Sequence, residues 1–201
     1  MTLYKSAPIS RTRRSRIGGF SMVELAVSMT VLLILTAIAI PTLMRSFRAY
    51  QLNDAAARLS DMLKFTRFEA VRRNKPVCFL MQQGGSTWTF GTDSACSGTF
   101  DTNGKQQVIV GFASILPTGA PPSSASITST LGASGSLTTL SSSPGSVKFD
   151  SRGAVSPLAA YVLYVGSVTN PEFGYRAVIL LPSGATQTWT APSGGPWQRI
   201  G

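Results

Sequence analysis

An apolar segment from Phe20 to Ile40 constrains this chain more than any other feature of its sequence. About 20 helical residues at a rise of 1.5 Å span a hydrocarbon core of roughly 30 Å, so this segment is long enough to cross a membrane once. It carries a single charge, Glu24, close to its start. A carboxylate inside hydrocarbon costs roughly 2.5 to 3.5 kcal/mol on insertion scales, so such a residue usually has a partner and a function.

Basic residues precede the apolar segment and set its expected orientation. The first nineteen residues contain no acid and five bases: Lys5, Arg11, Arg13, Arg14 and Arg16. Bases beside a membrane segment favour the cytoplasmic side, so we expect the C-terminal part outside the cytoplasm. Without this leader the net charge falls from +10 to +5, from 13 bases and 8 acids, and eight of those bases lie between Arg45 and Lys75. The head is therefore nearly neutral, and nucleic-acid binding is not expected from charge.

The residue inventory disfavours catalysis, metals and cofactors. The chain contains no histidine, which removes the commonest general base and metal ligand. Turn formation explains the scattered carboxylates of the C-terminal part better than calcium binding or an anchored enzyme does: Asp93, Asp101, Asp150 and Glu172. We expect a protein without enzymatic activity.

The only two cysteines, Cys78 and Cys96, are eighteen residues apart. Outside the cytoplasm this pair favours a structural disulfide over two buried thiols, and the spacing is not the C-x-x-C of redox enzymes.

Beyond Pro41 the pattern remains helical. One apolar stripe recurs at intervals of three and four residues, and it comprises Leu52, Ala56, Leu59, Leu63, Thr66 and Ala70. The opposite face is charged, and Asp54 and Arg58 can pair along it. We expect this helix to end near Asn74, because a residue that precedes a proline such as Pro76 is pushed toward extended geometry.

The remaining sequence predicts an antiparallel β-sheet head. Seven short segments are rich in β-branched and aromatic residues and are separated by turn residues: PVCFLMQ, TWTFG, QQVIVGF, SVKFD, AAYVLYVGSV, GYRAVILL and ATQTW. Trp88, Trp189 and Trp197 are expected to pack in or beside the sheet. A Ser/Gly/Pro-rich stretch, about 117–146, is expected to form an exposed, mobile loop with room for a short strand. The fold class is α+β, with a leader at 1–19, a membrane helix at 20–41, an amphipathic helix at 42–75 and the head at 76–201.

The residues Gly18 to Glu24 resemble the prepilin peptidase motif of type IV pilins and pseudopilins. An ordinary secretory cleavage site would follow the apolar segment, but Ile40 leads directly into Pro41 without an A-x-A pattern. The resemblance implies cleavage between Gly19 and Phe20, N-methylation of the new terminus, and a helix kink at Pro41. It also implies an inner-membrane protein that an assembly platform extracts into a filament with other pilins.

The resemblance implies that Glu24, at the fifth mature position, pairs with the N-terminal amine of a neighbouring subunit. Such a pair lowers the cost of both charges in a bilayer, so assembly is favoured over the isolated subunit. The alternative is that Glu24 only extends its carboxylate to the nearby interface.

The segment RLSDMLKFTRFEAVRRNKPVCFLMQQGGSTWTFG is similar to a narrower group, the GspH/FimT family of minor pseudopilins and pilins. Its "AR.EA..RN.PV" pattern and following W-x-x-G correspond here to Arg67, Glu69, Ala70, Arg73, Asn74, Pro76, Val77, Trp88 and Gly91, with Thr66 in place of the usual alanine. The stretch VKFDSRGAV also resembles a later strand and turn of the family. The resemblance implies a minor pseudopilin of type II secretion or, alternatively, a minor pilin of a type IV pilus.

Some relatives bind DNA through a basic motif in a C-terminal hairpin, but here the corresponding residues are Gly184 to Gln187 and contain no arginine. Arg176 and Arg199 lie nearby and could contact phosphates. Two arginines would bind weakly and with strong salt dependence, so solvated strand residues are the favoured interpretation.

Overall fold

The computed structural model describes residues 19–132 and 137–200, and its longest element is the helix α1 (Met22–Arg73). The chain divides into two compact units, with the boundary between Thr42 and Leu43. The predicted leader, residues 1–18, lies outside the described residues. Pro41 lies inside α1, and the helix continues on both sides of it.

In the first unit, residues 19–21 precede α1 and residues 22–42 form its N-terminal part, and all of them are exposed. Four hydroxyls donate to the carbonyl oxygen four residues earlier: Ser28 to Glu24 at 2.6 Å, Thr30 to Ala26 at 2.8 Å, Thr36 to Leu32 at 2.6 Å and Thr42 to Ile38 at 3.5 Å. These bonds satisfy the hydroxyls within the helix, so this part of α1 can lie in an apolar medium without unpaired hydroxyl groups.

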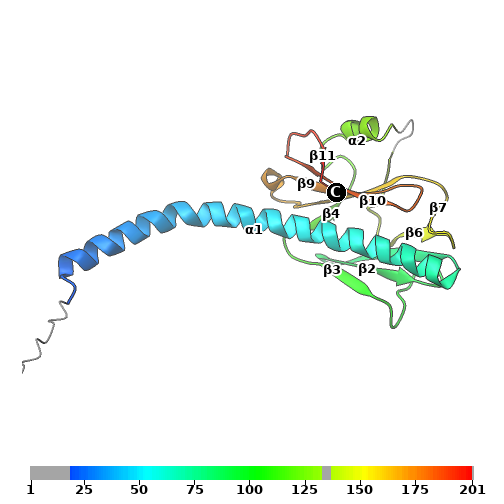
Figure 1. Cartoon of the computed structure of the whole chain (residues 1–201), viewed down its shortest axis with the longest axis horizontal. Coiled ribbons are helices and arrows are strands. Elements are labelled where there is room, and N and C mark those ends of the chain that lie inside the picture. The colour runs from blue at the N-terminus through cyan, green and yellow to red at the C-terminus, as the bar shows by residue number, and fades with distance from the viewer. Residues whose placement is uncertain (1–18, 133–136, 201) are drawn as a thin grey trace, which may run out of the picture. The chain divides into compact units, whose positions relative to one another are not determined.

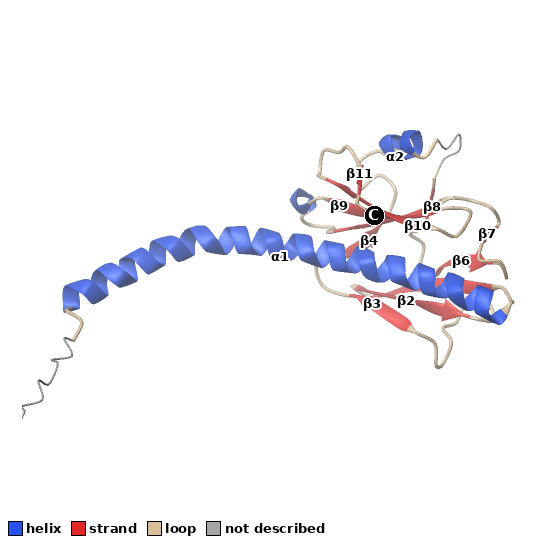
Figure 2. Cartoon of the chain, in the orientation of Figure 1, coloured by secondary structure: helices blue, strands red, loops and turns tan. Residues whose placement is uncertain are grey.

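The second unit contains two sheets (Figure 1). One has the strand order β3 (Gln106–Ile109), β2 (Thr87–Asp93), β1 (Val77–Gly84), β6 (Gly145–Phe149), β7 (Val155–Ser156). The other has the order β11 (Gln198–Arg199), β10 (Thr186–Ala191), β9 (Tyr175–Leu180), β8 (Tyr161–Gly166), β4 (Ser114–Leu116), and β5 (Thr138–Thr139) joins β8. All pairs are antiparallel except β5 with β8. Two short helices, α2 (Ala125–Thr130) and η1 (Pro171–Phe173), complete the unit (Figure 2).

The seven predicted strands are confirmed as β1, β2, β3, β6, β8, β9 and β10. The predicted stripe is also confirmed, because its six residues are all fully buried. All of them except Thr66 form the main core together with side chains from both sheets, such as Phe79 and Phe149 from one and Leu163 and Val178 from the other. The amphipathic half of α1 therefore packs against both sheets.

A second core lies on the other face of the sheet that contains β8 and β9. Residues of β9 alternate between the two cores, with Val178 and Leu180 in the main core and Ala177 and Ile179 in the second. A strand that is covered on both faces needs apolar residues on both sides, which explains the run AVIL at 177–180; Arg176, before this run, is the exception.

The segment 117–146 covers this second face, so the expectation of a fully exposed loop is wrong for several of its residues. It contains α2 and β5, buries Ile127 completely, and ends in β6. Trp197 packs on the same face and bonds to this segment. Its backbone nitrogen donates to Ser126 Oγ at 3.3 Å, and its Nε1 donates to the Pro122 carbonyl at 3.2 Å. The polar composition of this segment gave no sign that it packs on the sheet, because only a few apolar side chains are needed to cover the second core.

Arg67 links α1 to turns from both sheets. A Cβ at Gly153, in the β6–β7 turn, would lie 3.0 Å from Arg67 Cγ, and a Cβ at Gly184, in the β9–β10 turn, would lie 3.0 Å from Arg67 Cδ and would collide with the Gly153 carbonyl oxygen. Gly184 also has φ +79°. Only glycine fits at this crossing.

We predict that Gly184→Ala destabilises the protein far more than Gly85→Ala. Both glycines have positive φ, but Gly85 lies in the β1–β2 turn, where a Cβ would have no neighbouring atom within 4 Å. Gly85→Ala should therefore cost only about 1 to 2 kcal/mol of backbone strain. Gly184→Ala should cost at least about 1 to 3 kcal/mol more, because the turns must separate. Urea unfolding of both variants measures the difference, and equal costs would contradict the close approach.

Candidate functional site

The start of α1 is capped by a residue that the sequence patterns above do not single out. Ser21 Oγ accepts a hydrogen bond from the Glu24 backbone nitrogen at 3.1 Å, and the Ser21 carbonyl accepts one from Leu25 at 3.1 Å. The S-x-x-E spacing is that of a capping box and could have revealed Ser21 from the sequence.

The Glu24 carboxylate is exposed, and none of the residues in 19–132 and 137–200 donates a hydrogen bond to it. Phe20, four residues earlier, is 78% exposed, and Gly19 is also exposed. The surrounding helix surface is apolar, with large side chains such as Leu33, Leu35 and Ile38 more than half exposed. A surface of this kind requires lipid or another protein to cover it. This region can therefore offer one carboxylate to a partner within an otherwise apolar contact.

At its other end α1 carries a buried carboxylate, Glu69, held by two arginines. The Glu69 side chain is 9% exposed. Arg72 donates to it from Nε at 3.0 Å and from Nη2 at 2.8 Å, and Arg73 donates from Nε at 2.7 Å. The hydrogen bonds from Arg72 lower the pKa of Glu69 most strongly; burial opposes them, and Arg73 lowers the pKa further. These bonds brace the last turns of the helix.

The helix then ends at Arg73, next to Asn74, as the sequence predicted, and Asn74 itself adopts a left-handed conformation that was not predicted. Asn74 has φ 50°, and the Lys75 backbone nitrogen donates to the Ala70 carbonyl at 3.2 Å. Asparagine tolerates this conformation better than most residues. Pro76 follows, and β1 begins at Val77. In β2, Trp88 Nε1 donates to Ser114 Oγ at 3.1 Å, and a Cβ at Gly91 would lie 3.1 Å from the Lys105 carbonyl oxygen. The motif residues therefore shape the junction between helix and sheet.

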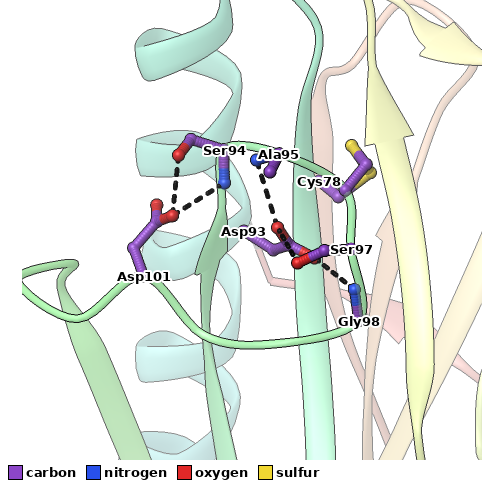
Figure 3. Close-up of a disulfide and its surroundings, with 8 residues drawn as sticks. Cys78, Asp93, Ser94, Ala95, Ser97, Gly98 and Asp101 are labelled. Carbon is purple, nitrogen blue, oxygen red and sulfur yellow. Dashed lines mark hydrogen bonds between the residues drawn. A yellow bond between two sulfur atoms is a disulfide. The ribbon is translucent and has the colours of Figure 1, made fainter.

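The predicted disulfide between Cys78 and Cys96 is confirmed, and Figure 3 shows it beside a hydrogen-bonded loop. Closing a loop of eighteen residues stabilises a fold by about 3 kcal/mol in the chain-entropy model. The bridge fixes the segment after β2 to β1.

Two aspartates organise the same loop. Asp93 is 1% exposed and accepts from the backbone nitrogens of Ala95 at 3.2 Å and Gly98 at 2.7 Å (Figure 3). Asp101 accepts from Ser94 Oγ at 2.7 Å and from its nitrogen at 3.0 Å. Burial opposes ionisation of Asp101, but the bonds from Ser94, a bond from Thr92 and the charge of Arg73 together outweigh it and hold the pKa of this carboxyl below its usual value. Both carboxylates therefore form turns, as the sequence favoured.

The two arginines considered for phosphate contact differ in their surroundings. Arg176 is only 9% exposed; its Nε donates to Asn53 Oδ1 at 2.6 Å and its Nη1 to the Tyr175 carbonyl at 2.9 Å. The expectation of a solvated strand residue is therefore wrong for Arg176, because it faces α1 from the same side of β9 as Val178. Arg199, in β11, is exposed. The structure does not combine them into one basic surface.

A profile of the family described as Type II transport protein GspH matches residues 55–184, well over half of the chain. The chain belongs to this GspH family. A second profile, the prokaryotic N-terminal methylation motif, matches residues 14–40. A GspH-family chain with this motif is a minor pseudopilin or pilin, and its filament is that of a type II secretion system or a type IV pilus. The apolar part of α1 is long enough to anchor it in a membrane.

Two solved structures are similar to this GspH-family chain, and both are crystal structures of the type IV minor pilin FimU from Pseudomonas aeruginosa. Each has 16% sequence identity and a TM-score of 0.47; the alignments cover 71% and 72% of this chain and 94% and 90% of the FimU chains. No curated protein matches the chain.

We predict that Glu69→Gln lowers stability at neutral pH by about 1 to 2 kcal/mol, because it removes charge-assisted bonds from a buried site. The folded-state pKa of Glu69 is lowered from 4.5, so its contribution is complete above that value and is lost as pH falls through the folded pKa. The deficit of the variant should therefore shrink in acid.

Urea unfolding at pH 7 and at pH 3 measures this change. Asp54→Asn is the matched control, since the Asp54–Arg58 pair is also helical, at 2.8 Å, but is largely exposed. Its cost should stay below about 0.5 kcal/mol. A pH-independent deficit in Glu69→Gln would contradict the role of the ionised carboxylate.

Proposed function

We propose that this chain is a non-enzymatic minor pseudopilin of the type II secretion pseudopilus. Prepilin peptidase cleaves it between Gly19 and Phe20, and the head lies in the periplasm while the apolar part of α1 anchors it in the inner membrane. The proposal is supported by the GspH match, whose family description refers to type II transport, and by the methylation motif, which spans the cleavage junction. The basic leader supports the orientation.

The exposed Glu24 carboxylate carries the proposal. Cleavage creates a positive amine at Phe20, one helical turn before Glu24. In a filament, the amine of one subunit pairs with Glu24 of its neighbour, while the apolar surfaces of adjacent helices cover one another. Two charges that enter the apolar contact together cost less than either charge alone, so the pair sets the axial register of the subunits.

The surroundings of the head carboxylates support a role without catalysis. Asp93 and Asp101 accept bonds within their own loop, Asp150 accepts from the nitrogens of Arg152 and Ala154, and Glu172 accepts from Asn170 Nδ2. Each is engaged in shaping a turn, and the chain has no histidine to serve as a general base. The head acts through its surface, by contacts with neighbouring subunits.

We predict that Glu24→Ala leaves leader cleavage intact and abolishes incorporation into filaments. Cleavage requires the junction at Gly19, whereas docking requires the carboxylate. Two measurements are made in cells that overproduce the filament. The molecular mass of the membrane-bound protein reports leader cleavage, and the amount of the protein in sheared pseudopili reports incorporation. Gly19→Val is the control for processing and should remain a full-length precursor. Normal incorporation of Glu24→Ala would refute the assembly role.

Deletion of the gene tests the choice of machine. We expect loss of secreted enzyme activity from the medium, with surface pili and twitching unchanged. The contrary pattern, normal secretion with loss of pili, twitching or DNA uptake, would assign the chain to a type IV pilus as a minor pilin. Re-expression of the wild-type chain should restore the lost activity, which shows that the defect comes from this gene. Re-expression of Glu24→Ala should not restore it if the chain acts by assembling into the filament.

A further inference from the structure

Arg176 lies in a groove of about 410 Å³ on the surface of the head. The lining residues come from α1, β9, β10 and the C-terminal segment: Asn53, Ala57, Arg176, Thr188, Thr190 and Ile200. Asn53 and Ala57 are one turn apart on the exposed side of α1. The groove is therefore open to a partner, while the arginine within it is mostly withdrawn from water.

The guanidinium of Arg176 has more hydrogen-bond donors than its surroundings use. It carries five N–H groups, of which one on Nε bonds to Asn53 and one on Nη1 bonds to the Tyr175 carbonyl. Both acceptors are neutral. No carboxylate among the described residues forms an ion pair with Arg176. Burial lowers the pKa of Arg176 and no nearby acid offsets this effect. A cation held in this way favours an incoming anion.

We propose that this groove binds a carboxylate, supplied by an aspartate or glutamate side chain of a neighbouring filament subunit. The two Nη groups present the planar fork that a carboxylate accepts in bidentate form. The Thr188 hydroxyl can donate to the same oxygens, whereas the Thr190 hydroxyl donates to the Tyr175 carbonyl at 3.5 Å, and Ala57 and Ile200 also line the groove. The identity of the neighbour as a filament subunit rests on the proposed function, whereas the carboxylate site does not.

A carboxylate fits the groove better than a nucleic-acid phosphate does. The lining contains one cation, and phosphate binding gains affinity from the number of positive groups that contact successive phosphates. A single carboxylate neutralises a single arginine. The burial of Arg176 also suits an inserted side chain, because a nucleic-acid backbone would need a cation that reaches outward.

Titration of the full-length protein in detergent micelles tests the site directly. The probe is sodium acetate, exchanged for sodium chloride at constant ionic strength, and the signal is the ¹⁵N-labelled Nε–H resonance of Arg176. We expect a saturable shift that is absent in Arg176→Gln and preserved in Arg152→Gln, whose arginine is exposed elsewhere on the head. An absent shift, or tighter binding of inorganic phosphate than of acetate, would overturn the proposal.

A second variant supplies the carboxylate from within the chain and does not remove the arginine. Ala57 lines the same groove, so Ala57→Glu should place an acid beside Arg176 and raise Tm by about 2 to 4 °C relative to Ala57→Gln. In the Arg176→Gln background the two variants should have the same Tm. Ala57→Glu should also reduce incorporation into filaments at least tenfold relative to Ala57→Gln, because its own carboxylate occupies the groove.

An unchanged Tm would contradict the site, whatever the filament assay shows. An unchanged incorporation with a raised Tm would overturn the neighbouring subunit as the source of the carboxylate. The acetate titration and the Tm need no filament, so their failure is distinct from failure of the proposed function, which Glu24→Ala tests.

Discussion

The structure depends on one helix that meets two different surroundings. The N-terminal part of α1 is exposed and apolar all round, whereas the part beyond Leu43 buries one stripe against two sheets. Neither part could replace the other, because an all-apolar surface in water would aggregate and a charged surface in lipid would be expelled. The change of surface pattern along a single helix therefore separates the anchor from the domain that folds around it.

Within the head, the last turns of α1 contact turns of both sheets, which are far apart in the sequence. Glu69 joins with two arginines to brace the helix end, and Arg67 lies against glycines from the turns of both sheets. These contacts give a physical reason for the pattern that resembles the GspH/FimT family. Arg67 lies against the turns of both sheets, Glu69 and Arg73 fix the end of the helix, and Asn74 and Pro76 direct the chain into β1.

Much of the fold could be predicted because its signals are local. The seven longest strands, the buried stripe and the helix end at Asn74 follow from periodicity and turn residues. A short strand within 117–146 was allowed for and is present as β5, but β4, β11 and the packing of 117–146 onto the second face could not be predicted, since Ile127 and Trp197 meet only through tertiary packing. The groove around Arg176 was missed for the same reason, because Asn53 and Arg176 are 123 residues apart in the chain. Ser21 could have been found, because its capping spacing is visible in the sequence.

The inward bonds of Ser28, Thr30 and Thr36 leave these hydroxyls indifferent to whether lipid or protein surrounds the helix. Each hydroxyl already has its acceptor one turn back, so it neither gains nor loses a bond when lipid chains are exchanged for protein side chains. The helix can leave one apolar medium for the other with its polar groups undisturbed. In the proposed assembly, the Glu24 carboxylate gains the amine of a neighbouring subunit when the helix moves from lipid into the filament, so this one charge would favour the filament over the bilayer.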